Sequence, residues 1–319
     1  AGHEWRSHPH GRTRPCRQHD GSTVTTAAQA KAQADRDTIF VEDGEVLAIH
    51  ALPSEQFIMR IRAPKCAASA QPGNFVHITC DESLPMRRPL SIMRVGDDWI
   101  EILYKIVGQG LRLLSRKNTG DSVSVLGPIG QPFHMSPDRP NTLLIGGGVG
   151  IPPMVYIADW LRQDEGHWSP FAILGSEIPF PFDLQESSLA VDGVGSDVFS
   201  TISLLESWGV PARLTSLQGY EGCHDGYVTD LADQWLAALP EDELGKVEIF
   251  ACGPTPMLKA VADLAARYDL PCQVSLEEFM ACAVGGCAGC AVKINTPDGE
   301  AMKRVCVDGP VFNAATVVW

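Results

Sequence analysis

Residues 141–163, NTLLIGGGVGIPPMVYIADWLRQ, decide the fold class of the second half of this chain. A short apolar run at 143–145 leads into four glycines within five positions, and a helical stretch starts near Pro152. This order indicates a buried strand, a glycine turn and a helix. The turn departs from the G-x-G-x-x-G fingerprint. It still places bare backbone at the carboxyl end of a strand, where a nucleotide could approach closely.

Further apolar runs follow in the same half of the chain: PFAILGS, ARLTSLQ and KVEIFACGP. They alternate with helical segments such as TPMLKAVADLAARYDL. Strands that alternate with helices predict a parallel α/β sheet, which we expect over residues 141–270. Cys252 ends one of these strands, so it should lie at the same carboxyl edge as the glycine turn. The alternative for Cys252 is a small buried hydrophobic residue.

The first half of the chain has a different pattern. Six short runs of strand composition lie between residues 39 and 130, and Gly, Pro, Asp or Asn separate them at about ten-residue intervals. This is typical of an antiparallel sandwich or barrel, which we expect over residues 38–140. One helical stretch, LRLLSRK, interrupts the pattern after Gly110.

Two motifs of this half could together hold a flavin. RPLS at 88–91 opens a strand, where the guanidinium of Arg88 could bind a phosphate and the hydroxyl of Ser91 could face a polar ring edge. LYK at 103–105 precedes GQGL at 108–111, a glycine turn whose free backbone N–H groups could bind a pyrophosphate. Taken alone, the first motif could equally be a strand entry with a surface arginine.

Four of the ten cysteines lie close together near the C-terminus, as Cys282-x4-Cys287-x2-Cys290 and then, after fifteen residues, Cys306. This resembles the plant-type [2Fe–2S] spacing. The residues between the first three cysteines are small, so the backbone could wrap closely around cluster sulfides and donate N–H groups to them. Structural zinc is an alternative, but zinc sites favour two C-x2–4-C pairs. Ordinary buried thiols are a further alternative.

Length and composition limit the remaining possibilities. A chain of 319 residues suggests two or three domains. The net charge of −14 argues against a general nucleic-acid binder. The sequence contains no run of 18 apolar residues, so it does not predict a membrane span. Residues 1–37 are polar and without periodicity, so we expect a disordered leader. The first residues contain no apolar secretory segment, which favours a cytoplasmic protein with reduced cysteines.

In this chain order, the motifs resemble the electron-transfer subunit of class 1B, NAD-dependent dihydroorotate dehydrogenase, a branch of the ferredoxin–NADP reductase superfamily. The resemblance covers about residues 39–315. It includes MRRPLSI, LLIGGGVGIPPM, FACGPTPML, LEEFMACAVGGCAGCAVKI and RVCVDGPVF. It implies a flavin barrel at 38–140, an NAD(P)-binding α/β domain at 141–270 and a cluster module at 271–319.

The resemblance also implies cofactors, residues and a partner. The cofactors are FAD, a [2Fe–2S] cluster and NAD(H) as co-substrate. The partner is an FMN-containing catalytic subunit that oxidises dihydroorotate in pyrimidine biosynthesis, in a heterotetramer. Ser91 would lie near the flavin ring, and Cys252 with Gly253 would face the nicotinamide. The FAD residues are Arg88, Pro89, Leu90, Ser91, Leu103, Tyr104, Lys105, Gly110 and Leu111. The nucleotide glycines are Gly147, Gly148 and Gly150, and the cluster ligands are Cys282, Cys287, Cys290 and Cys306.

Two positions depart from the family pattern. Leu111 replaces the usual threonine, which removes one hydroxyl contact to phosphate. Leu217 and Gln218 stand where relatives carry an acidic pair, so the choice between NAD and NADP stays open. Two other functions also stay open. One is a related flavodehydrogenase subunit for ferredoxin, sulfide or hydrogenase chemistry, and the other is a non-enzymatic zinc-binding nucleotide fold.

Overall fold

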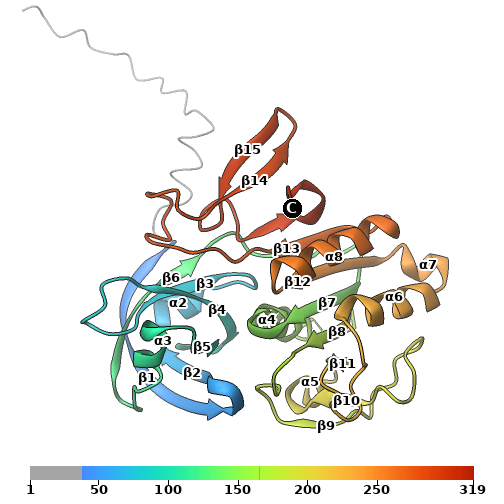
Figure 1. Cartoon of the computed structure of the whole chain (residues 1–319), viewed down its shortest axis with the longest axis horizontal. Coiled ribbons are helices and arrows are strands. Elements are labelled where there is room, and N and C mark those ends of the chain that lie inside the picture. The colour runs from blue at the N-terminus through green and yellow to red at the C-terminus, as the bar shows by residue number, and fades with distance from the viewer. Residues whose placement is uncertain (1–37, 165) are drawn as a thin grey trace, which may run out of the picture. The chain divides into compact units, whose positions relative to one another are not determined.

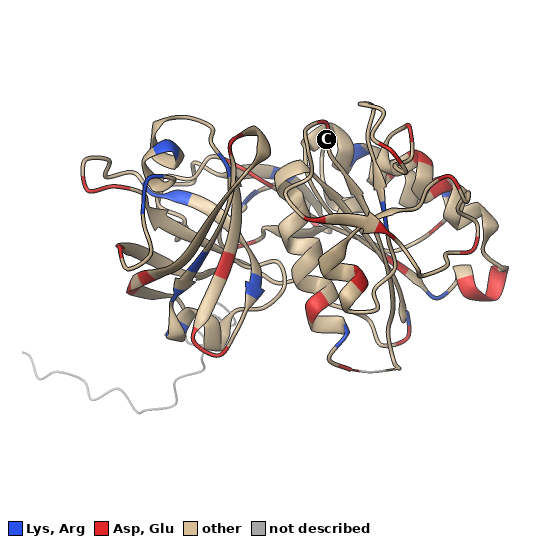
Figure 2. Cartoon of the chain, turned by 90° about the horizontal axis from the view of Figure 1, so that it is seen from below, with Lys and Arg blue, Asp and Glu red and all other residues tan. Residues whose placement is uncertain are grey.

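The computed structural model describes residues 38–164 and 166–319, and the predicted leader, residues 1–37, lies outside the described residues. The described strands form a closed barrel, a six-stranded sheet and two small hairpin sheets (Figure 1). Acidic residues are spread over both the barrel and the α/β part of the chain (Figure 2). Among the helices of the described residues, none has the length and apolar character that crossing a bilayer requires.

The barrel confirms the six strands expected in the first half of the chain. Its order is β1-β2-β5-β4-β3-β6, and all neighbouring pairs are antiparallel. Alternate side chains, such as Ile61, Ile100 and Ile102, are fully buried inside it. The strands are β1 (Phe40–Leu52), β2 (Gln56–Arg62), β3 (Phe75–Thr79), β4 (Arg88–Val95), β5 (Trp99–Lys105) and β6 (Ser122–Ile129), with helices η1 (Pro53–Glu55), α2 (Pro64–Ser69) and α3 (Gln109–Leu114).

The predicted α/β sheet is also present, with the order β11-β8-β7-β12-β13-β16. Neighbouring pairs are parallel except β13 with β16. The strands are β7 (Asn141–Gly147), β8 (Ser169–Gly175), β11 (Ala212–Thr215), β12 (Val247–Cys252), β13 (Cys272–Ser275) and β16 (Val311–Asn313). The helices are η2 (Gly148–Gly150), α4 (Ile151–Leu161), α5 (Ser203–Ser207), α6 (Val228–Ala238), α7 (Glu241–Leu244), α8 (Thr255–Arg267) and η3 (Ala314–Thr316).

Helices cover both faces of this sheet, which explains why its strands are apolar throughout. Leu143 and Ile145 of β7 share a core with α6 and α8, whereas Leu144 between them shares a core with α4. Successive side chains of a strand point to opposite faces, so one apolar run supplies both cores.

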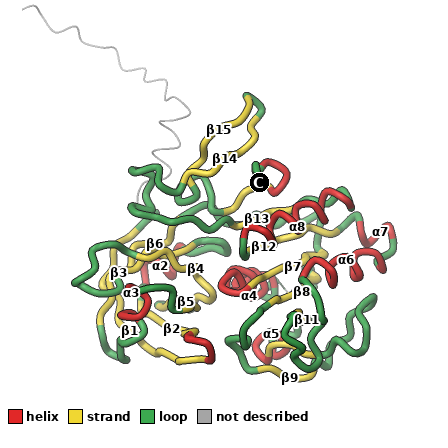
Figure 3. Tube along the Cα trace, in the orientation of Figure 1, coloured by secondary structure: helices red, strands yellow, loops and turns green. Residues whose placement is uncertain are grey.

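The C-terminal segment differs from the expected separate module. β13 and β16 both belong to the α/β sheet, so a boundary after residue 270 would divide that sheet. Between them lie a loop without regular structure and the hairpin β14 (Ala291–Thr296) with β15 (Gly299–Arg304) (Figure 3). A second hairpin, β9 (Leu184–Glu186) with β10 (Ser200–Ile202), was not expected from the sequence.

Hydrogen bonds join the barrel directly to the α/β sheet. The hydroxyl of Tyr156 on α4 donates to the carbonyl of Ala70 at 2.8 Å. The side chain of Gln56 on β2 donates to the carbonyl of Pro179 beyond β8, also at 2.8 Å. These contacts hold the two parts side by side, and Gln56 also lines the cavity described next.

Candidate functional site

A cavity of about 1600 Å³ lies where the barrel, the carboxyl edge of the α/β sheet and the loop before β14 meet. Ligands of open α/β sheets bind at this edge, where the strand order reverses, here between β7 and β12. Eight of the nine sequence-predicted flavin residues line the wall of this cavity. Those in the wall are Arg88, Pro89, Leu90, Ser91, Leu103, Tyr104, Lys105 and Leu111.

Arg88 of the RPLS motif and Arg87, which directly precedes it, have different surroundings. Arg87 is tied into the barrel, because its guanidinium donates to the carbonyls of His77 and Ser124 at 3.0 and 2.9 Å and to the Ser124 hydroxyl at 2.9 Å. Arg88 uses only Nη1 in this way, toward the carbonyls of Met86 and Arg87 at 2.8 and 3.1 Å. The rest of its guanidinium therefore remains available to a ligand.

The remaining edge of Arg88 faces the glycine turn that begins α3. A Cβ atom added at Gly110 would stand 3.1 Å from Nε and 3.2 Å from Nη2 of Arg88. Glycine thus leaves room beside the guanidinium, in a cradle that a larger residue would fill. Gly110 itself is not among the residues that line the cavity, but its neighbour Leu111 is. Arg88, together with this turn, fits the phosphates of a flavin dinucleotide.

Tyr104 supplies a second sign of a missing ligand. Its ring stacks on Phe57, with centroids 5.6 Å apart and an interplanar angle of 16°. The side chain is buried, yet the hydroxyl has no hydrogen-bond partner among the described residues, and burial raises its pKa. Buried hydroxyls are normally paired. A heteroaromatic ring with polar edges, held in the cavity, would provide such a partner.

The glycine turn after β7 opens toward the cavity. Gly147 and Gly148 line the wall. Gly148 has φ +55°, in the left-handed region, and a Cβ atom there would meet nothing within 4 Å. Gly150 has a different role, because an added Cβ atom would collide with the backbone of Cys252. The third predicted nucleotide glycine is therefore required by packing of the turn against β12.

Cys252 lies at the carboxyl end of β12, as expected, but its side chain is fully buried. Neither Cys252 nor Gly253 belongs to the residues that line the cavity. Burial, with the nearby Glu277 carboxylate, raises the pKa of the Cys252 thiol well above its usual value. The thiol is thus neutral, and its contact with nicotinamide stays a prediction.

The cysteine motif forms a loop in which the first two thiols, those of Cys282 and Cys287, approach the backbone and each other. The N–H groups of Gly286 and Gly289 donate to Sγ of Cys282 and Cys287 at 3.2 and 3.4 Å. Cys282 and Cys287 also hydrogen-bond to each other. Such N–H···S contacts match the expectation from the small residues of the motif.

The fourth cysteine joins this loop from the far side of the hairpin. Cys306 follows β15, and its Sγ lies 3.4 Å from Sγ of Cys290. Both thiols are buried, whereas Cys287 is exposed. Within residues 38–164 and 166–319, no three His, Cys, Asp or Glu side chains adopt metal-holding geometry, so the cysteines stand as two pairs. Four thiols in one short segment are nevertheless a donor set that suits an iron–sulfur cluster.

Burial and hydrogen bonding set the acidity of these thiols. Burial alone would raise the pKa of Cys282, but hydrogen bonds from the Val284 backbone, from Cys287 and from Gly286 lower it to about 7. Burial, together with Cys290, raises the pKa of Cys306 to about 12. A thiolate is the form that ligates metal, so Cys282 is prepared for ligation by the loop itself.

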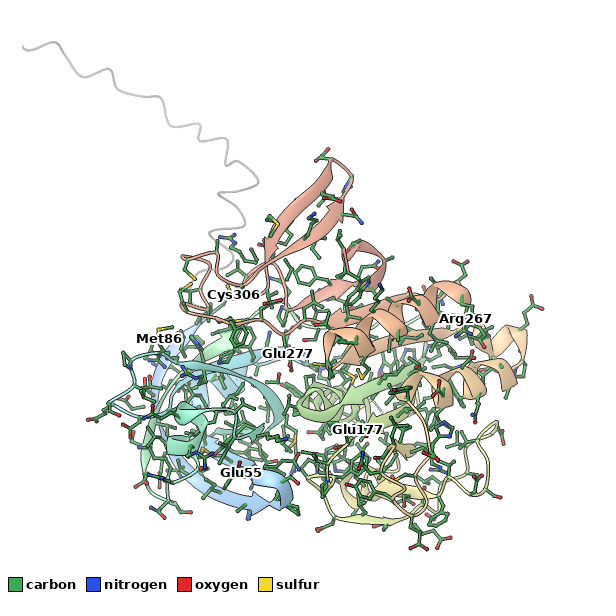
Figure 4. The ribbon with its side chains drawn as sticks, in the orientation of Figure 1. Glu55, Met86, Glu177, Arg267, Glu277 and Cys306 are labelled. Carbon is green, nitrogen blue, oxygen red and sulfur yellow. The ribbon has the colours of Figure 1, made fainter. Side chains whose placement is uncertain are left out.

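Two acidic residues of the cavity wall were not predicted from the sequence. Glu277, in the segment before the cysteine loop, lines the cavity, and desolvation there raises the pKa of its carboxyl group. Glu177 lies beyond the end of β8. Figure 4 shows Glu277 near the cysteine loop and Glu177 on the α/β side. Both residues follow the carboxyl end of a strand, and this position in the sequence could have marked them as candidate site residues. Only the fold shows that they share a cavity.

Comparison with known proteins agrees with this site. Residues 277–318 match the family model of the iron-sulfur cluster binding domain of dihydroorotate dehydrogenase B. The electron transfer subunit of dihydroorotate dehydrogenase B (NAD(+)) from Caldanaerobacter subterraneus subsp. tengcongensis is 33% identical over 251 residues, 78% of this chain and 87% of the relative. The subunit of the same name from Desulforamulus reducens is 31% identical and covers 88% of this chain and 98% of the relative.

Solved structures show the same architecture. A structure of NADH-dependent reduced ferredoxin-NADP oxidoreductase, described for flavin-based electron bifurcation, superposes with a TM-score of 0.68 at 27% identity, over 87% of this chain and 90% of the other. The ferredoxin reductase in carbazole 1,9a-dioxygenase shares the fold, with a TM-score of 0.55 at 24% identity over 73% of this chain and 67% of the other. By sequence and fold together, this chain belongs to the family of electron transfer subunits of dihydroorotate dehydrogenase B (NAD(+)).

Proposed function

We propose that this chain relays electrons between NAD(H), FAD and a [2Fe–2S] cluster, and so couples dihydroorotate oxidation by a partner to NAD+ reduction. The observation that carries the proposal is the single cavity bordered by the RPLS strand, the glycine turn and the segment that leads into the cysteine loop. A relay requires three redox groups at short range. Residues that we assign to the flavin and to the dinucleotide line this cavity, together with Ala281 and Gly289 beside the proposed cluster ligands.

The flavin supplies the central chemistry when bound, because it exchanges two electrons with nicotinamide and single electrons with an iron–sulfur centre. The chain's own residues bind and orient. We assign Arg88 to the pyrophosphate and Ser91 to a polar edge of the ring. Tyr104 would then satisfy its buried hydroxyl on the same ligand. No side chain is needed as a general acid or base for hydride and electron transfer.

The nucleotide and cluster residues follow from the same arrangement. Gly147 and Gly148 would bring backbone to the dinucleotide, since no side chain intervenes there. Gly150 and Cys252 would support this turn from behind. Four thiols would ligate the cluster, with backbone N–H groups of the loop stabilising its sulfur atoms. The proposed ligands are Cys282, Cys287, Cys290 and Cys306.

The catalytic partner is inferred from the relatives, which are named as electron transfer subunits of dihydroorotate dehydrogenase B. We infer that this partner carries its own FMN, forms a heterotetramer with this chain and acts in the cytoplasm in pyrimidine biosynthesis. The exposed Cys287 marks the loop from which electrons would leave toward the partner.

The test uses the flavin- and iron-replete chain without a partner. It should oxidise NADH with ferricyanide as acceptor and should not oxidise dihydroorotate. Dihydroorotate oxidation should appear when the catalytic subunit is added. Turnover of dihydroorotate by the chain alone would refute the subunit function, and failure to oxidise NADH would refute the relay.

One alternative has structural support, a related flavodehydrogenase that serves ferredoxin, because a ferredoxin-NADP oxidoreductase superposes over most of the chain. Co-purification of the tagged chain separates the two functions. A dihydroorotate-oxidising flavoprotein in the complex supports our proposal, whereas a ferredoxin-linked enzyme supports the alternative. A zinc-binding module would instead be colourless and free of acid-labile sulfide.

A further inference from the structure

Glu177 is part of the cavity wall and is held there by the loop that follows β11. Its Oε2 accepts a hydrogen bond from Nε2 of Gln218 at 3.0 Å, and its Oε1 accepts one from the backbone N–H of Leu217 at 3.4 Å. The carboxylate itself comes from the segment after β8, the strand that pairs with β11.

The topology puts this carboxylate where the adenosine half of a dinucleotide would lie. β8 is the second strand of the α/β sheet in chain order, and it runs parallel to β7, which carries the glycine turn. In dinucleotide-binding sheets, an acid after this strand hydrogen-bonds to the ribose hydroxyls. Glu177 meets that description, and Gly175 and Ser176 beside it also line the cavity.

The charges of the cavity wall point in the same direction. Its cations are Arg87, Arg88 and Lys105, all on the barrel side, and its α/β part contains no Lys or Arg within the described residues. A 2′-phosphate brings about two negative charges and is normally bound by arginine or lysine. Beside Glu177 it would meet a carboxylate and no compensating cation. An uncharged 2′-hydroxyl would instead donate to that carboxylate.

We propose that Glu177 selects NAD(H) over NADP(H) by accepting a hydrogen bond from the ribose 2′-hydroxyl, and that Gln218 and the Leu217 backbone position its carboxylate. This inference rests on the proposed function, because it assumes that the cavity binds a nicotinamide dinucleotide. It assigns to one residue a choice that the sequence left open.

The test is direct binding, measured by isothermal titration calorimetry of the FAD-loaded chain with NAD+ and with NADP+. The wild type should bind NAD+ more tightly. Glu177→Gln removes the charge at nearly constant shape, so NAD+ affinity should fall about tenfold to a hundredfold, and the preference over NADP+ should narrow. Glu186→Gln is the matched control, since this exposed residue of β9 lies outside the cavity wall, and its binding should equal the wild type.

The outcomes separate this inference from the function beneath it. Equal affinity of the wild type for NAD+ and NADP+, or an unchanged preference in Glu177→Gln, would overturn the role of Glu177 and leave the relay intact. A wild type that binds neither nucleotide would overturn the proposed function as well. Melting curves recorded by circular dichroism for both variants should match the wild type, because both side chains are exposed.

Discussion

Replacing Arg88 with alanine should release FAD while leaving the barrel folded. The structure separates these two effects, because Arg87 donates its hydrogen bonds to the barrel strands whereas Arg88 keeps part of its guanidinium free toward the cavity. Arg88 donates within the barrel only to the carbonyls of Met86 and Arg87, which belong to its own loop. Its free edge faces Gly110 and the cavity, where we place the pyrophosphate.

The size of the effect follows from the contacts that disappear. A charge-assisted hydrogen bond contributes about 1.5–3 kcal/mol, which corresponds to roughly tenfold to more than a hundredfold in affinity. The loss of stability should be below about 1 kcal/mol, because the half-buried Arg88 bridges no separate strands. Arg88→Lys retains the charge but not the planar guanidinium group, so its FAD affinity should lie between those of the wild type and Arg88→Ala.

The assay is FAD binding to the deflavinated chain, followed by quenching of flavin fluorescence, with thermal unfolding measured in parallel. Arg87→Ala is the control, because Arg87 joins β3 to β6 through three hydrogen bonds. It should lower the melting temperature more than Arg88→Ala does. If Arg88→Ala binds FAD as tightly as the wild type, Arg88 is a surface residue and the flavin site is wrongly placed.

Three further predictions concern other parts of the site. Cys287→Ser should lose iron and acid-labile sulfide but keep FAD. The control Cys223→Ser should keep both the cluster and FAD. Loss of both cofactors from Cys287→Ser would contradict separate sites. Gly148→Ala forces a side chain into the left-handed region at a cost of about 1–2 kcal/mol, so NADH titrations should show weaker binding with FAD retained, and unchanged binding would count against the turn. Desolvation raises the pKa of Glu277 in the folded protein. The contribution of this carboxyl group to the free energy of unfolding is therefore fully present below its unfolded pKa of about 4.3, and it is lost as the pH rises through the folded pKa. Glu277→Gln should therefore raise the melting temperature more at pH 8 than at pH 5, and an equal change at both values would refute this.

The sequence predicted those parts of the fold that periodicity and turn residues determine locally. The barrel strands have strand composition, and Gly or Pro lies between them, so all six were identified although β3 and β5 are buried at consecutive positions. The glycine turn between β7 and α4 was also predicted from the sequence. The strands β13 and β16 were not, because four and three residues are too few for a periodic pattern. Only pairing with β12 and with each other defines them.

The site was predictable where one segment carries the chemistry, as in the cysteine loop and the RPLS strand. It was not predictable where two segments meet. Glu177 and Gln218 are 41 positions apart, and their contact exists only because β8 and β11 are adjacent in the sheet. Cys252 shows the opposite case, since its position at a strand end was expected but its complete burial depends on the turn packed over it.

The most direct test of the relay is an anaerobic titration of the chain, loaded with FAD and iron, with NADH. The flavin absorbance and the electron paramagnetic resonance signal of the cluster are followed together. The account predicts that NADH bleaches the flavin and that the signal of a reduced [2Fe–2S] centre then appears, with no partner present. A flavin that stays oxidised, or a cluster that stays oxidised beside a fully reduced flavin, would contradict it.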